Sequence, residues 1–239
     1  MRPFFRWIAL LSLALIALQF FFLVRIAMMA TINPQSTAFE RSNAWRIHNE
    51  KRAPHWHQQW ADYDQISEYL KRAVIASEDD GFAYHDGVDW DALEKAWQKN
   101  SQVKAQGIHH AKVPTPPKVV GGSTITQQLA KNLFLSGERT LLRKGQEFVL
   151  TFLLENLLDK QRILELYLNH VEWGDGVFGA EAAAQHYYHK PASLLAPLEA
   201  ARLAVMLPRP KYFEKLPHSS YLAERSEVIA ARLAYAELP

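Results

Sequence analysis

The first strong pattern in the chain is an apolar run near its N-terminus. Residues 7–24 (WIALLSLALIALQFFFLV) contain only one serine and one glutamine as polar interruptions. As a helix rising about 1.5 Å per residue, this run nearly spans a hydrocarbon core of about 30 Å. Arg2 and Arg6 would also suit a cleaved signal peptide, but the run is long for one and no small-x-small cleavage site follows. We therefore expect a retained transmembrane anchor within residues 1–30.

Beyond the anchor the pattern changes twice. Residues 31–60 are polar and show no helical period, which favours a juxtamembrane linker. Across residues 61–239, apolar side chains recur every three or four positions, and no sustained alternation competes with them. A polar, proline-containing stretch at residues 99–120 interrupts this pattern and predicts a loop. The sequence thus predicts one mostly α-helical domain behind a linker.

Composition narrows the chemistry that this domain can perform. The chain has 239 residues, 27 lysines and arginines, 25 acidic residues and no cysteine. The absence of cysteine excludes a thiolate nucleophile, a disulfide framework, a cysteine zinc site and an iron–sulfur cluster. A net charge of +2 argues against nucleic-acid binding through bulk electrostatics.

The first segment with candidate chemistry covers residues 73–89, where an apolar helical pattern ends in successive acids. The polar and aromatic residues of interest are Glu78, Asp79, Asp80, Phe82 and His85. Negative charge at a helix C-terminus is unfavourable because of the helix dipole. A solvated acidic helix end is the ordinary explanation, and a carboxylate with a raised pKa that acts as a base is the functional one.

The second segment, residues 121–135 (GGSTITQQLAKNLFL), begins with two glycines that free the backbone. Thr124 and Gln127 have the spacing of a capping box, so a helix is expected to begin there. The free N–H groups at such a helix start form a natural anion site. Gln128 and Lys131 are three residues apart and share one face of this helix.

The third segment covers residues 139–155 and carries a stripe of charge. Arg139, Arg143 and Glu147 follow one another at steps of four, and Lys144 lies beside them. Salt bridges along a surface helix would explain the stripe. The apolar run FVLTFLL that follows instead places these charges at the border of a buried or membrane-facing body. Guanidinium and ammonium groups together suit a pyrophosphate.

Together these segments resemble the peptidoglycan glycosyltransferases of glycosyltransferase family 51. The matching motifs are E-D-x-x-F-x-x-H-x-G at 78–87, GGSTITQQLAKNLFLS at 121–136, R-K-x-x-E at 143–147 and DKQRILELYLN at 159–169. With no transpeptidase region in the chain, it is most similar to the monofunctional biosynthetic form. The resemblance implies a lysozyme-like, bilobal helical domain on a single N-terminal transmembrane helix.

The resemblance also implies an activity and a location. Such enzymes polymerise lipid II into linear glycan strands by inverting β-1,4 transfer, with release of polyprenyl diphosphate. The implied partners are lipid II, the growing glycan chain, inner-membrane lipid and proteins of cell division or elongation, with no nucleic acid. We expect a single-pass protein of the bacterial inner membrane, with a cytoplasmic N-terminus and a periplasmic domain.

Residue roles follow from the matching motifs. By resemblance, Glu78 is the catalytic base and Glu147 is a second catalytic carboxylate. The residues expected to bind substrate are Asp79, Phe82, His85, Ser123, Thr124, Gln128, Lys131, Asn132, Arg139, Arg143 and Lys144. Glu147 either holds a divalent cation, Mg or Mn, against the diphosphate or orients the basic groups and the sugar. No organic cofactor is expected, and Tyr167 in the last motif is interpreted as core packing.

Two other classes of function remain as alternatives. A membrane-anchored, glycan-cleaving enzyme on a lysozyme-like fold also uses carboxylates, but it does not need basic groups around a pyrophosphate. A non-catalytic scaffold of cell-wall synthesis would need neither the carboxylates nor the basic groups.

Overall fold

The computed structural model describes residues 2–50, 56–98, 122–135, 137–138 and 140–239. Its α-helices with described bounds are α1 (Arg2–Met28), α2 (Ala38–Asn49), α3 (Glu68–Glu78), α5 (Ile125–Phe134), α6 (Leu141–Leu157), α7 (Lys160–His170), α8 (Ala180–Tyr188), α9 (Pro197–Met206), α10 (Pro210–Glu214) and α11 (Ser220–Arg232). Residues 90–98 are also helical. The predicted mostly α-helical fold is confirmed.

Short strands and 3-10 turns join the helices. The strands are β1 (His57–Gln58), β2 (Glu172–Gly174) and β3 (Val177–Phe178), and the 3-10 turns are η1 (Tyr63–Gln65), η2 (Ala192–Leu194) and η3 (Leu233–Tyr235). In the sheet order β1-β3-β2, β1 runs parallel to β3 and β2 runs antiparallel to it. This small sheet ties the segment after α2 to the turn before α8.

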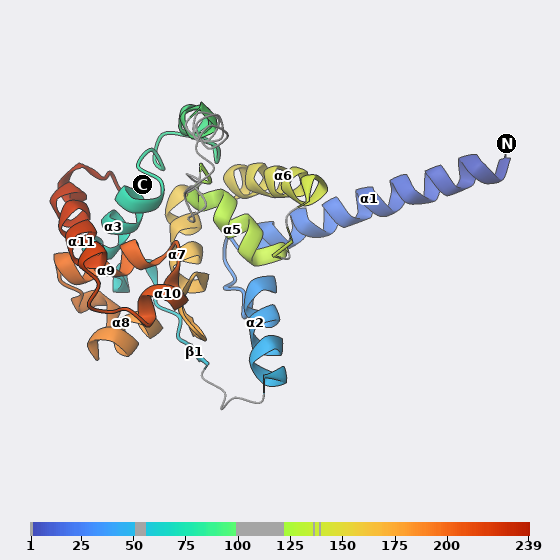
Figure 1. The fold of residues 1–239 in the computed structure, drawn as a ribbon. Helices are drawn as coiled ribbons and strands as arrows, with labels where there is room; N and C mark the ends of the chain where they lie inside the picture. The colour runs from blue at the N-terminus through green and yellow to red at the C-terminus, as the bar shows by residue number, and fades with distance from the viewer. Residues whose placement is uncertain (1, 51–55, 99–121, 136, 139) are drawn as a thin grey trace, which may run out of the picture.

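Helix α1 projects away from the body, and its C-terminal part lies beside α5 and α6 (Figure 1). Within the described part of the chain, residues 4–28 alone form a helix long and apolar enough to cross a membrane, with a mean hydropathy of 2.5. Most of its apolar side chains are exposed, whereas the core helix of a soluble protein would bury them. These properties fit the predicted membrane anchor.

Specific contacts fix α1 against the α5–α6 pair. Gln19 and Gln146 exchange two amide hydrogen bonds of 2.9 and 3.1 Å. Near the end of α1, the Phe22 ring packs edge-on against Phe134, and the Arg25 guanidinium lies 5.7 Å from the centre of the same ring. Helix α1 therefore packs directly against the helical domain.

Helix α2 lies inside the segment that was expected to be an irregular linker. Thr37 and Glu40 form a capping box at its start. The buried positions of α2 are Glu40, Asn43 and Ile47, so two of its three inward side chains are polar. An apolar period therefore could not reveal this helix. Glu40 is fully buried and contacts Nδ1 of His170 at 2.8 Å, which joins α2 to the end of α7.

The helices form two groups with α7 between them (Figure 1). In one group α3 packs against α9 and α11, and in the other α5 packs against α6. Helix α7 also packs against α5, and its Tyr167 is among the largest fully buried side chains, together with Phe82 and Trp173. This arrangement brings the C-terminal end of α3 to the N-terminal end of α5.

Candidate active site

Two adjoining cavities follow the junction of α3, α5 and α6. One, of about 260 Å³, is lined by residues that include Glu78, Asp79 and Thr124. The other, of about 360 Å³, is lined by residues that include Gln128, Lys131, Arg143, Lys144 and Glu147. Ser123 lines both. The acid and the cations therefore lie along a single cleft.

Glu78 is the last residue of α3 and lies at the cleft. Its Oε2 accepts a hydrogen bond of 2.9 Å from Nε2 of Gln128. Burial raises the pKa of the Glu78 carboxyl above its ordinary value, the Gln128 hydrogen bond and the charge of Lys131 oppose this, and Asp79 adds to it. A carboxylate with a raised pKa is a stronger base than an exposed one.

Asp79 joins the end of α3 to the beginning of α5. Its Oδ1 lies 2.8 Å from Nε2 of His85, and its Oδ2 accepts the backbone N–H of Ile125 at 2.9 Å. The backbone N–H of Gly87 donates to Nδ1 of His85, so Nε2 carries a proton and donates to Asp79. This network holds the neighbouring Glu78 against α5.

The beginning of α5 has the predicted capping box. The Thr124 hydroxyl oxygen accepts the N–H of Gln127, and the Gln127 side chain accepts the N–H of Thr124, both at 3.2 Å. The Thr124 hydroxyl also donates to the carbonyl oxygen of Gly87 at 2.6 Å. Gln128 and Lys131 both line the larger cavity, as their predicted shared face requires.

Two cations surround one buried carboxylate on α6. Nη1 of Arg143 lies 2.8 Å from Oε2 of Glu147, and Nζ of Lys144 contacts Oε1. Glu147 is buried, so the predicted spacing of four residues along the helix brings this pair together away from solvent. Within the described residues, Nε of Arg143 is buried without a hydrogen-bond partner. Together with Lys131, this cluster has more positive than negative charge.

The same contacts test Glu147 as a ligand of a divalent cation. Both of its carboxylate oxygens are occupied by Arg143 and Lys144. In the described ranges, no group of three or more histidine, cysteine, aspartate or glutamate residues could hold a metal ion. The protein side chains present do not fit a cation site of their own, so we derive no catalytic step through a metal.

Most of the predicted site residues line this cleft: Glu78, Asp79, Ser123, Thr124, Gln128, Lys131, Arg143, Lys144 and Glu147. Three others line neither cavity. Phe82 is fully buried beneath Nζ of Lys160, His85 supports Asp79, and Asn132 is buried on α5. Their roles as substrate contacts remain predictions. Arg139 and the loop at 99–120 lie outside the described residues.

The structure adds residues that the motifs did not indicate. Arg225 and Arg232 from α11 and Asp89 line the Glu78 cavity. Arg232 also forms a 2.9 Å ion pair with Asp80. The two arginines are seven residues apart, two helical turns, so they lie on one face of α11. That spacing was a detectable signal, but nothing in the sequence linked α11 to α3.

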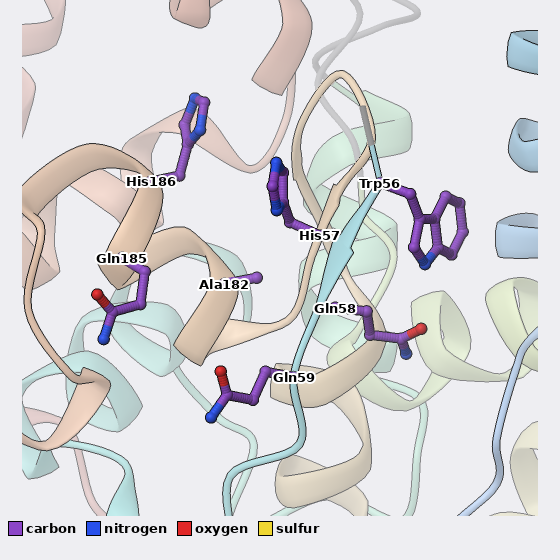
Figure 2. A pocket seen from close by; sticks show the side chains of 7 residues that line it. All are labelled: Trp56, His57, Gln58, Gln59, Ala182, Gln185 and His186. Carbon is purple, nitrogen blue, oxygen red and sulfur yellow. The ribbon is translucent and has the colours of Figure 1, made fainter. Parts of the chain in front are cut away.

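A third cavity lies between β1 and α8, as Figure 2 shows. It has a volume of about 330 Å³ and is lined by Trp56, His57, Gln58, Gln59, Ala182, Gln185 and His186. Gln58 donates to Glu40, Gln185 donates to Glu181, and His186 lies 3.4 Å from Glu214. Because these polar groups are engaged within the protein and the cavity shares no lining residue with the cleft, we do not assign the reaction to it.

A half-buried acid and a cation cluster along one cleft, in a helical domain that follows a helix suited to a membrane anchor, indicate the class of glycosyl-transfer enzymes. Comparison with known proteins agrees. Residues 46–234 match the family model described as Transglycosylase. The chain therefore belongs to the transglycosylase family, whose domain has a lysozyme-like helical fold.

Similar curated proteins extend this match to nearly the whole chain. Biosynthetic peptidoglycan transglycosylase from Burkholderia vietnamiensis is 53% identical over 238 residues, which cover 98% of this chain and 92% of the relative. The proteins of that name from Burkholderia multivorans and Burkholderia pseudomallei are each 52% identical over 98% of this chain, and the match covers 92% and 88% of their lengths.

Proposed function

We propose that this protein is a peptidoglycan glycosyltransferase that polymerises lipid II into linear glycan strands. The observation that carries the proposal is the cleft itself. A desolvated acid, Glu78, lies near one end, and the cations Lys131, Arg143 and Lys144 line the other. The family match and the names of the similar proteins support the same activity.

Glu78 supplies the base for the reaction. It takes the proton from the 4-hydroxyl of the acceptor sugar as that oxygen attacks the anomeric carbon of the donor. The carbon–oxygen bond to the diphosphate breaks on the opposite face, and the diphosphate leaves with the electron pair. The α-linked donor thus becomes a β-1,4-linked product, and the strand grows by one disaccharide.

The cation cluster stabilises the departing diphosphate. A guanidinium binds phosphate oxygens through two N–H groups, and an ammonium adds a point charge. The side chains of Arg143 and Lys144 are 17% and 35% exposed and both line the cleft. Charge that develops in a cleft with little water is stabilised most by groups already in place. Glu147 holds Arg143 and Lys144 in position for this task.

The anchor gives the proposal its location. An N-terminal membrane helix directly before the domain suits an enzyme whose substrate carries a polyprenyl chain in the bilayer. We propose a cytoplasmic N-terminus and a periplasmic domain at the bacterial inner membrane. Interaction with proteins of cell division or elongation remains a prediction.

The test uses the full chain in lipid vesicles with labelled lipid II and follows strand formation. Glu78→Gln should lower the rate by about 10²- to 10⁴-fold, the usual contribution of a positioned base. Glu227→Gln makes the same change at an exposed site on α11 and should leave the rate unchanged. A Glu78 variant as active as the wild type would disprove the base assignment.

Two further arms separate the remaining alternatives. Arg143→Ala should lower kcat by about 10²- to 10³-fold, as loss of one stabilising donor does. A chelator added to the same assay tests whether Glu147 and the substrate diphosphate together hold a divalent cation. Fragments released from preformed cell wall, with no lipid II consumed, would instead indicate a glycan-cleaving enzyme.

A further inference from the structure

A hydrogen-bonded chain reaches Glu78 from the interior of the protein. The hydroxyl of Tyr167 on α7 lies 3.1 Å from Oε1 of Gln128 on α5. Nε2 of the same Gln128 side chain donates to Oε2 of Glu78 at 2.9 Å. Tyr167 is only 1% exposed, so substrate does not reach it directly. The chain therefore connects α7, α5 and α3 through one amide group.

The direction of the Tyr167 hydrogen bond determines which way the amide faces. Burial raises the pKa of the Tyr167 phenol well above its ordinary value, and the charges of Glu78 and Asp79 add to this. The phenol therefore keeps its proton and donates it to the amide oxygen of Gln128. That oxygen is thereby held toward Tyr167, and the amide N–H groups are left facing Glu78.

The amide orientation matters because its two ends have opposite effects on a carboxyl group. An N–H that donates to a carboxylate favours the charged form and lowers its pKa. A carbonyl oxygen in the same place accepts only from the protonated acid, which favours the neutral form. Without a donor at Tyr167, the Gln128 amide can rotate by half a turn and present its oxygen to Glu78.

We propose that Tyr167 is a positioning residue for glycosyl transfer, whose hydroxyl orients Gln128 so that its N–H group faces Glu78 and favours the carboxylate form of that residue. The inference rests on the proposed function of Glu78 as the base. It assigns to Tyr167 a task that its place in an apolar helical pattern does not indicate.

Other charged groups also face Glu78, and the test must leave them unchanged. Asp79 and Asp80 follow Glu78 in the chain, and Asp89 directly precedes the helix at residues 90–98. Lys131 lies on α5, and Arg225 and Arg232 lie on α11. Replacing Tyr167 by phenylalanine removes one oxygen and alters none of these charges. A change in the titration of Glu78 can then be attributed to the hydroxyl.

The experiment measures the pH dependence of kcat/KM for lipid II polymerisation by the full chain in vesicles. Tyr167→Phe should move the acidic limb of the pH profile of kcat/KM to higher pH by about half to one unit, which is the effect of one hydrogen bond. On that limb kcat/KM should fall about three- to tenfold. At a pH well above the limb, kcat and KM should both match the wild type.

A matched variant controls for the loss of a hydrogen-bonded tyrosine hydroxyl. Tyr187 on α8 donates to the carbonyl oxygen of Trp173 at 2.9 Å and lines neither cavity of the cleft. Tyr187→Phe should cost stability of a similar size without moving the limb. In a Gln128→Ala background, Tyr167→Phe should produce no further shift, because the amide through which it acts is gone.

Two results would overturn the inference. One is an unmoved limb in Tyr167→Phe together with a fall in Tm equal to that of Tyr187→Phe, which would leave Tyr167 a packing residue. The other is a shift of the same size in the Gln128→Ala background. Full activity of Glu78→Gln is a separate outcome, because it would remove the base itself and with it the proposed function of Glu78.

Discussion

Replacement of Asp79 by asparagine tests how the cleft is held together. The Asp79 side chain is 2% exposed and bridges two elements. One carboxylate oxygen faces the ring N–H of His85 at 2.8 Å, and the other accepts the backbone N–H of Ile125 at 2.9 Å. Asparagine has nearly the same shape but offers one acceptor and one donor. One of the two N–H groups would then face another donor.

The expected loss can be worked out from these contacts. Hydrogen bonds to a charged group contribute about 1.5–3 kcal/mol each, and a buried N–H left facing another donor costs about 1–3 kcal/mol more. We therefore expect Asp79→Asn to lower the free energy of unfolding by about 3–5 kcal/mol. The whole free energy of unfolding of a typical domain is only about 5–15 kcal/mol. Polymerisation should fall as well, since Glu78 is the adjacent residue.

The neighbouring acid provides the control for this prediction. The side chain of Asp80 is 64% exposed and forms one ion pair, with Arg232. Such surface pairs contribute about 0–1 kcal/mol, so Asp80→Asn should change stability by no more than that. Urea unfolding of the detergent-solubilised full chain can be followed by the fluorescence of its 7 tryptophans. Equal midpoints for the two variants would refute the bridging role of Asp79.

Two further predictions concern backbone geometry and the anchor. Gly179 has a φ of +84°, and a Cβ there would lie 2.7 Å from a backbone oxygen, so Gly179→Ala should lower stability by roughly 3 kcal/mol. A Cβ added at Gly145 on α6 would meet no atom within 4 Å, so Gly145→Ala should raise stability by about 1 kcal/mol. Thermal melts in which the Gly179 and Gly145 variants have equal Tm would contradict both expectations. Because the chain lacks cysteine, Gln19→Cys with Gln146→Cys should react in membranes with a short bifunctional thiol reagent. Phe20→Cys with Gln146→Cys should react far less, since Phe20 is 65% exposed, and equal yields on a gel would mean that α1 packs differently.

Local patterns were sufficient for much of the fold. The apolar run of α1, the capping box of α5 and the step of four between Arg143 and Glu147 are all short-range features, and the structure confirms each. Such features depend on residues within a few positions of one another, so a single sequence carries them. The same logic failed for α2, because part of its buried face is polar and forms hydrogen bonds rather than apolar contacts.

Tyr167 shows a different limit of sequence interpretation. Its position in an apolar helical pattern correctly indicated burial, since its side chain is 1% exposed. Periodicity reports only that a side chain faces inward. It does not report which polar atom the phenol meets, here the amide oxygen of Gln128. Sequence analysis did not identify Arg225 and Arg232 of α11 as cleft residues for a similar reason. The residues with which they line the cleft lie far away in the chain.

The sequence alone determined most of the helices, the apolar N-terminal helix, the family and the set of candidate chemical groups, because each is encoded by local spacing or by motif. Only the tertiary structure decided how those groups meet. Asp79 accepts the N–H of Ile125 across 46 positions of the chain, and Gln128 and Tyr167 are separated by 39. Contacts over such separations depend on how α3, α5 and α7 pack together, and no local pattern specifies that packing. The environment that raises the pKa of Glu78 is therefore a property of the assembled fold.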